Sequence, residues 1–112
     1  MNMFTLYIGT NQTDAKNEIV CIVGERFPSF TLIQGEGFFR GTAEPMWMVK
    51  IATEDCQRVI ETAAHIRQTL DQDGVGIESD GSYHRCTQAD PATALSKAWQ
   101  EREFRKISDT LL

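Results

Sequence analysis

A glycine-rich stretch between two strand-like runs constrains the fold of this chain more than any other feature. Residues 33–51 read IQGEGFFRGTAEPMWMVKI, where three glycines surround Phe38 and Phe39, and Glu44 opens an alternating run. Glycine tolerates positive φ and lets a backbone approach another group closely, so the stretch predicts a bulged hairpin or open loop. We expect this hairpin to form one wall of a small-molecule site. Alternatively, its glycines serve only the turn.

The residues after the glycines exclude two phosphate-binding motifs. A dinucleotide fingerprint leads from a strand into a helix, and a phosphate loop requires a Gly-Lys-Ser/Thr sequence. Here the glycines lead into another strand, and no such triplet is present. An aromatic pair able to stack on a flat base remains. If the chain is extended there, Phe38 and Phe39 point to opposite faces, so we expect one of them in the core.

The rest of the chain alternates between strand and helix patterns. The expected strands are residues 3–9, 30–34, 44–53, 75–78 and 83–87, and the expected helices are residues 15–27, 54–73 and 92 to about 107. In the first strand, Phe4, Leu6 and Ile8 share one face, and Met3, Thr5 and Tyr7 share the other. We expect Thr53 to be the N-cap of the second helix and Gly74 its C′ residue.

This order of elements predicts one α+β domain over residues 1–112. Strand-helix-strand-strand-helix-strand is the ferredoxin-like pattern, with both helices on one face of an antiparallel sheet. A return strand extends the sheet, and a C-terminal helix follows. The uncovered sheet face would form an apolar patch, so we expect it to be covered by association into a homo-oligomer.

Charge and composition exclude several classes of partner. Sixteen acidic residues against eleven basic ones give a net charge of −5, which disfavours binding to nucleic acid. No apolar run approaches the roughly 20 residues of a membrane helix, and the N-terminus has no basic region typical of a signal peptide. The three cysteines are widely spaced and resemble reduced thiols. We therefore expect a cytoplasmic protein without a membrane partner.

Three carboxylates stand near the predicted hairpin and strand ends: Glu36, Glu44 and Glu78. Carboxylates can hold ribose hydroxyls or an amino group and can stabilise a positive charge. Each of them could equally be a solvated surface residue. Glu44 is the strongest candidate because it lies between the glycine segment and a strand with a buried pattern.

The histidines and cysteines do not form a catalytic pattern. His65 and His84 have no carboxylate or cysteine at metal-ligand spacing, so we expect no metal and no cofactor. Cys86 and His84 lie two residues apart on one strand and do not point at each other as a nucleophile and its base must. We therefore expect no covalent nucleophile.

One motif in this chain resembles a known family. Residues 39–44, FRGTAE, have the pattern aromatic-x-Gly-x-x-Glu, followed by an alternating strand, a helix and DQDGVGI at residues 71–77. This pattern is similar to that of the phage-encoded S-adenosylmethionine (SAM) lyases, long called SAM hydrolases. The similarity spans about residues 35–78. The family often has tyrosine where this chain has Phe39, so a hydrogen bond from that position is lost.

The resemblance implies an activity and an assembly. In such enzymes the carboxylate of SAM attacks its own γ-carbon, giving methylthioadenosine and homoserine lactone, without a cofactor. The family forms trimers with sites between subunits and would serve a phage as an antirestriction enzyme against SAM-dependent host defence. By this resemblance Glu44 holds the nucleoside or amino group, Phe38 or Phe39 packs on adenine, and carbonyls of residues 35–41 face the sulfonium.

The predicted site therefore comprises Glu44 as the catalytic residue and, as substrate-binding residues, Phe38, Phe39, Gly41, Glu36 and Glu78. The chain also resembles PII-like signalling proteins and an uncharacterised family of small ferredoxin-like proteins. The alternative function is a non-catalytic PII-like binding or interaction module. A PII-like regulator usually has a long loop between its second and third strands, whereas the connection expected here is only some ten residues.

Overall fold

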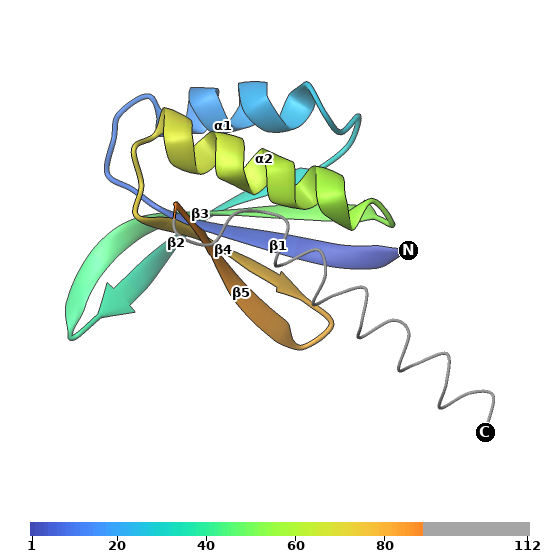
Figure 1. The fold of residues 1–112 in the computed structure, drawn as a ribbon. Coiled ribbons are helices and arrows are strands. Elements are labelled where there is room, and N and C mark those ends of the chain that lie inside the picture. Colours follow the sequence, from blue (N-terminus) through green and yellow to red (C-terminus); the bar gives the residue numbers. More distant parts are fainter. Residues whose placement is uncertain (89–112) are drawn as a thin grey trace.

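Two helices lie on the same face of a five-stranded antiparallel sheet, and no described residue covers the other face, which we call the uncovered face (Figure 1). The fold is seen in a computed structural model that describes residues 1–88, so the C-terminal helix predicted from sequence lies outside the described residues. The elements in chain order are β1 (Asn2–Gly9), α1 (Ala15–Gly24), β2 (Thr31–Phe39), β3 (Thr42–Thr53), α2 (Cys56–Thr69), β4 (Gly74–Ser79) and β5 (Ser82–Thr87).

The strand order across the sheet is β2-β3-β1-β4-β5. The first four strands in sequence have the ferredoxin-like arrangement, and β5 adds a fifth strand by pairing with β4. This confirms the predicted α+β fold, including the return strand. Neither helix of residues 1–88 has the length and apolar character needed to span a bilayer.

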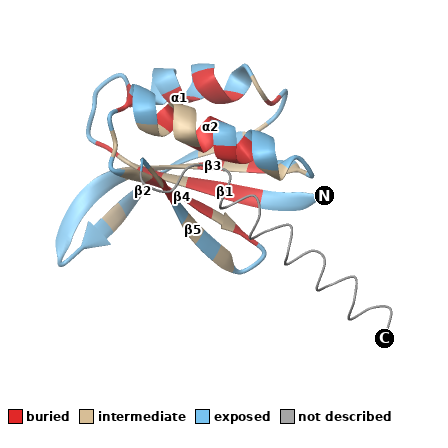
Figure 2. Cartoon of the chain, in the orientation of Figure 1, coloured by how far each residue is buried: buried red, intermediate tan, exposed pale blue. Residues whose placement is uncertain are grey.

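The core lies between the helices and the sheet (Figure 2). In β1 the side chains of Phe4, Leu6 and Ile8 point into it, as their alternation predicts. The apolar stripes of α1 and α2 cover these side chains because helical residues three or four apart share one face. The helices thereby cover the apolar side chains of β1 on this side of the sheet.

The glycine-rich stretch forms a hairpin, as predicted, but its first strand, residues 31–39, runs without a bulge or an open loop, so that part of the prediction is wrong. The pairing of β2 with β3 runs in one register from Thr31 opposite Lys50 to Phe39 opposite Thr42. Arg40 and Gly41 alone make the turn, with φ of 50° and 81°. Two consecutive residues with positive φ match the twist of the flanking strands, which allows so short a connection.

The expectation that Phe38 or Phe39 lies in the core is also wrong. Their exposed fractions are 70% and 71%. The far end of the β2–β3 hairpin extends beyond the part of the sheet that the helices cover (Figures 1 and 2). Because neither α1 nor α2 packs on that end of the hairpin, both faces of the strand are accessible there within the described residues.

Both ends of α2 differ from the sequence prediction. Asp55 is the N-cap, and its side chain accepts a hydrogen bond from the backbone nitrogen of Arg58 at 3.0 Å. Thr53, the predicted cap, accepts from the backbone nitrogen of Asp55 instead. At the other end the chain turns through Asp71, whose φ is 51°, and Gly74 already belongs to β4. The helix is shorter because aspartate satisfies the first free amides and Asp71 adopts the left-handed conformation.

Candidate functional site

The uncovered face of the sheet carries a hollow of about 530 Å³. Its lining comes from every strand and from the loop before β4: Tyr7, Gly9, Gly37, Phe38, Phe39, Glu44, Met46, Gln72, Asp73, Gly74, Gly76, Tyr83 and Arg85. In β1 and β4 the lining positions alternate with the core positions, so local alternation places them on the uncovered face.

Glycines form the floor under one half of the hollow. The carboxylate of Glu44 lies over Gly9, where an added Cβ would be 3.1 Å from its Oε2. The methyl group of Met46 lies over Gly37, where an added Cβ would be 2.8 Å away. At both positions the missing side chain leaves space for the larger side chain above it. Their main role at this site is to let Glu44 and Met46 lie close to the sheet.

In the other half of the hollow, two glycines of β4 leave space for a tyrosine and an arginine of β5. Tyr83 lies over Gly76, where an added Cβ would be 2.8 Å from Cε2 of the ring and in contact with Oη. Arg85 lies over Gly74, where an added Cβ would be 2.9 Å from Cγ. The hollow therefore has an acidic side chain over β1, a basic one over β4, and an aromatic ring beside them.

A hydrogen bond fixes a tyrosine in the wall. The hydroxyl of Tyr7 donates to Oε1 of Glu78 at 2.9 Å. Burial raises the pKa of Tyr7, and the nearby charge of Glu78 raises it further, so the phenol stays protonated and keeps donating. The rings of Tyr7 and Tyr83 are tilted by 53° with centroids 6.2 Å apart, a favourable aromatic arrangement.

Three of the predicted site residues line the hollow: Glu44, Phe38 and Phe39. Among described residues, Glu44 forms no hydrogen bond or ion pair, so its carboxylate is available to a ligand. Phe39 also carries the guanidinium of Arg40, 5.2 Å from its ring centroid. The glycine-rich hairpin therefore does contribute one wall of a hollow, as expected.

The other three predicted residues are not part of the lining. Alternation places Glu36 on the opposite face of β2 from Gly37. Gly41 forms the turn at the end of the hairpin. Glu78 lies on the uncovered face, but its carboxylate accepts the hydrogen bond from Tyr7. Glu78 thus orients a wall residue.

The sequence reasoning missed the residues contributed by β4 and β5. Gly74 and Gly76 alternate with buried Val75 and Ile77, a local signal that their side of the strand lacks bulk. That signal becomes informative only once β4 is known to lie between β1 and β5. The ferredoxin-like order and the return strand imply this placement, but they do not tell which side chains of β5 lie over these glycines.

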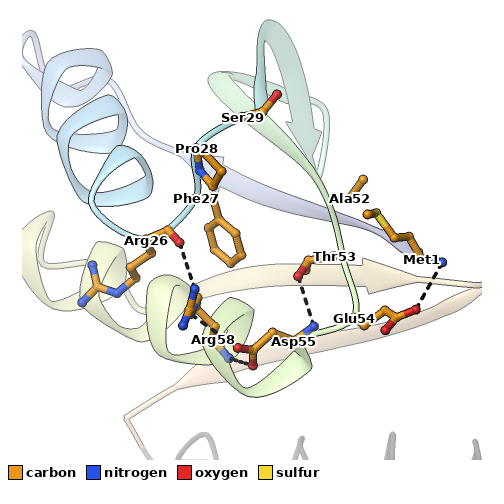
Figure 3. Close-up of a pocket in the computed structure, with 10 residues that line it drawn as sticks. All are labelled: Met1, Arg26, Phe27, Pro28, Ser29, Ala52, Thr53, Glu54, Asp55 and Arg58. Atoms are coloured by element: carbon orange, nitrogen blue, oxygen red, sulfur yellow. Dashed lines mark hydrogen bonds and ion pairs between the residues drawn. The ribbon is translucent and has the colours of Figure 1, made fainter.

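A second hollow, of about 620 Å³, lies at the end of α1 and the start of α2 (Figure 3). Its polar groups already bind one another. Arg58 pairs with Asp55 at 3.4 Å and donates to the carbonyl of Arg26, while Glu54 pairs with the N-terminal ammonium. These contacts connect the loops that enter and leave the helices. The hollow over the sheet, with unpaired charges, is therefore the better candidate site.

Comparison with solved structures gives the fold a precedent. A phage SAM lyase in its apo state matches with a TM-score of 0.58 at 15% sequence identity, covering 77% of this chain and 88% of that one. This chain has the fold of a phage SAM lyase. A phage SAM lyase in complex with S-methyl-5'-thioadenosine matches with a TM-score of 0.53 at 14% identity over the same shares.

The resemblance predicted from sequence is therefore confirmed at the level of fold. No protein-family model matches the chain, and no curated protein matches it. At this sequence identity the similarity to the SAM lyase structures shows the fold alone, and the chemistry must be argued from the site.

Proposed function

We propose that this protein is a SAM lyase that converts SAM to methylthioadenosine and homoserine lactone. The observation that carries the proposal is the position of Glu44 and the two hairpin phenylalanines around one hollow in this fold. A protein of the same fold binds S-methyl-5'-thioadenosine, which is the nucleoside product of this reaction.

The reaction requires little from the protein beyond positioning. One oxygen of the SAM carboxylate forms a bond to the γ-carbon while the bond from that carbon to sulfur breaks. The electron pair goes to sulfur, so a neutral thioether leaves and no proton is transferred. Folding the substrate so that carboxylate and γ-carbon are in contact can therefore supply most of the acceleration.

The hollow offers groups for both ends of such a substrate. Phe39 lies on the same face of β2 as Gly37, so its exposed ring can stack on adenine, whereas alternation places Phe38 on the opposite face of the strand. Glu44 can accept hydrogen bonds from the substrate ammonium or from ribose hydroxyls. The backbone carbonyls of a strand lie in the plane of its sheet, so those of β2 do not point into the hollow. The sulfonium would instead lie over Tyr7 and Tyr83, whose ring faces attract cations.

The assembly we propose is a homotrimer whose sites lie between subunits. Met3 and Tyr83 on the uncovered face are 53% and 60% exposed, and both hairpin phenylalanines are more exposed still. A second copy lying on this face would cover these side chains and close the hollow from above. Loss of activity on dilution to monomers, measured alongside light scattering, would be expected.

The biological role that fits this activity is depletion of SAM in the host cytoplasm by a phage. Host restriction and modification systems that use SAM would lose their substrate. Expression of the protein in cells should therefore lower the methylation of plasmid DNA, and the Glu44→Gln variant should not.

Incubation of the purified protein with SAM, followed by chromatography, tests the proposal. We expect methylthioadenosine and homoserine lactone in equal amounts. Glu44→Gln should remove most of the activity because the neutral amide lacks the charge that strengthens the bond to the ammonium, whereas His65→Ala, on α2, should keep it. Absence of methylthioadenosine above background at high protein concentration would refute the enzyme.

The alternative is a non-catalytic PII-like binding module. The β2–β3 connection consists of Arg40 and Gly41 alone, so the long loop typical of PII-like regulators is missing there. This observation disfavours the module. Binding of methylthioadenosine without any turnover of SAM would favour it.

A further inference from the structure

Arg85 is the one cationic side chain that lines the hollow within the described part of the chain. It belongs to β5 and faces the same side of the sheet as Tyr7, because both are paired with Gly76 of β4. Its charge opposes that of Glu44 in a protein with a net charge of −5.

The absence of a side chain at Gly74 determines where the guanidinium lies. Cγ, Cδ and Nε of Arg85 lie on the backbone of Gly74, where any Cβ would overlap them. The side chain thus lies along the sheet and reaches into the hollow. Within residues 1–88 no carboxylate forms an ion pair with it, although Asp73 also lines the hollow. Its hydrogen-bond donors are free to bind a ligand.

The two opposite charges lie over neighbouring strands. Glu44 leans over Gly9 of β1, and Arg85 leans over Gly74 of β4. Tyr7 is paired with Gly76 in the antiparallel β1–β4 pairing. Gly9 lies two residues after Tyr7 and Gly74 two residues before Gly76, so the two glycines lie toward the same end of these strands. Adjacent strands are about 4.8 Å apart. The two charged groups do not pair with each other, so the space between them suits a ligand that carries both an ammonium and a carboxylate.

We propose that Arg85 binds the α-carboxylate of SAM while Glu44 binds its α-ammonium. The inference rests on the proposed function and assigns the amino-acid end of the substrate to the β5 side of the hollow. The adenine end then lies toward the β2–β3 hairpin with Phe38 and Phe39. Arginine is suited to this role because its planar fork can hold one carboxylate oxygen and leave the other in contact with the γ-carbon.

This role has a kinetic signature. The carboxylate loses its negative charge as the lactone bond forms, so Arg85 attracts the substrate more strongly than the transition state. This weakening of the attraction opposes the gain in kcat that comes from holding the carboxylate near the γ-carbon, so the net effect of Arg85 falls mainly on KM. Arg85→Gln should therefore raise KM about tenfold and leave kcat within about twofold.

Titration calorimetry with two ligands tests the inference apart from turnover. S-adenosylhomocysteine carries the amino-acid end with a neutral sulfur, and methylthioadenosine lacks that end. For Arg85→Gln we expect about tenfold weaker binding of S-adenosylhomocysteine and unchanged binding of methylthioadenosine. Arg85→Lys should recover part of the affinity. Lys16→Gln removes the same charge from an exposed position of α1 and should change neither ligand.

The possible results separate the two proposals. Equal binding of both ligands by the wild type and Arg85→Gln would overturn the role of Arg85 and leave the SAM lyase proposal in place. Equal weakening of both ligands would show that Arg85 only supports the shape of the hollow, which also overturns the inference. If the wild type binds neither ligand, the proposed function fails, and the assignment of Arg85 fails with it.

Discussion

Gly76 provides a direct test of whether the glycines of β4 serve the site or the strand. A methyl group at this position would be 2.8 and 2.9 Å from Cε2 and Cζ of Tyr83. Carbon atoms in ordinary contact are about 3.5–4.0 Å apart, so the ring must retreat by roughly 1 Å. Tyr83 is exposed enough to rotate away from the sheet, and the backbone of Gly76 does not have a positive φ. Gly76→Ala should therefore fold.

The expected result is a change in function without a matching change in stability. Alanine favours a strand over glycine by about 0.5–1 kcal/mol, which offsets the lost contact of the ring, so the free energy of unfolding should change by less than about 1 kcal/mol. A displacement of about 1 Å in the wall of a site can cost up to roughly 100-fold in rate. We expect kcat/KM for SAM to fall between about 10- and 100-fold, measured by chromatography of methylthioadenosine.

Gly81 supplies the opposite control. It lies in the β4–β5 turn with φ of 79°, is open to solvent and does not line the hollow. Gly81→Ala should cost about 1 kcal/mol in urea unfolding because alanine is strained at positive φ, while activity stays normal. The reasoning is refuted if Gly76→Ala keeps full activity, or if it destabilises the protein as much as Gly81→Ala does.

Two further predictions concern the core and the tyrosine wall. Leu6 is fully buried in the central strand, so Leu6→Ala should lower the free energy of urea unfolding by about 3–5 kcal/mol, and Val20→Ala at an exposed helix position by less than about 1 kcal/mol. The raised pKa of Tyr7 means that its contribution to stability is present below about pH 10 and is lost as pH rises through its folded pKa. The Tm of Tyr7→Phe should therefore fall less than the Tm of the wild type between about pH 8 and 11. An equal fall in both proteins would show that Tyr7 does not titrate as proposed.

Local patterns in the sequence were sufficient for the element order and for the two faces of β1. Phe4, Leu6 and Ile8 are buried and Met3 is exposed, because alternation along a strand depends only on the backbone geometry of that strand. The prediction of the hairpin and the choice of Glu44 as a site residue also came from local sequence patterns. The conformation of the glycines could not be predicted from local patterns, because glycine is compatible with both a loop and a strand. Pairing with β3 stabilises the strand.

The sequence by itself thus determined the order of strands and helices, the apolar side of β1, and one wall of the candidate site. Only the tertiary structure decided what faces that wall. Gly9 meets Glu44 and Gly76 meets Tyr83 because β1 lies between β3 and β4, and β5 returns beside β4. Pairing of strands depends on contacts between residues far apart in the chain. The hollow, with the arginine that gives it a second charge, is a product of that pairing.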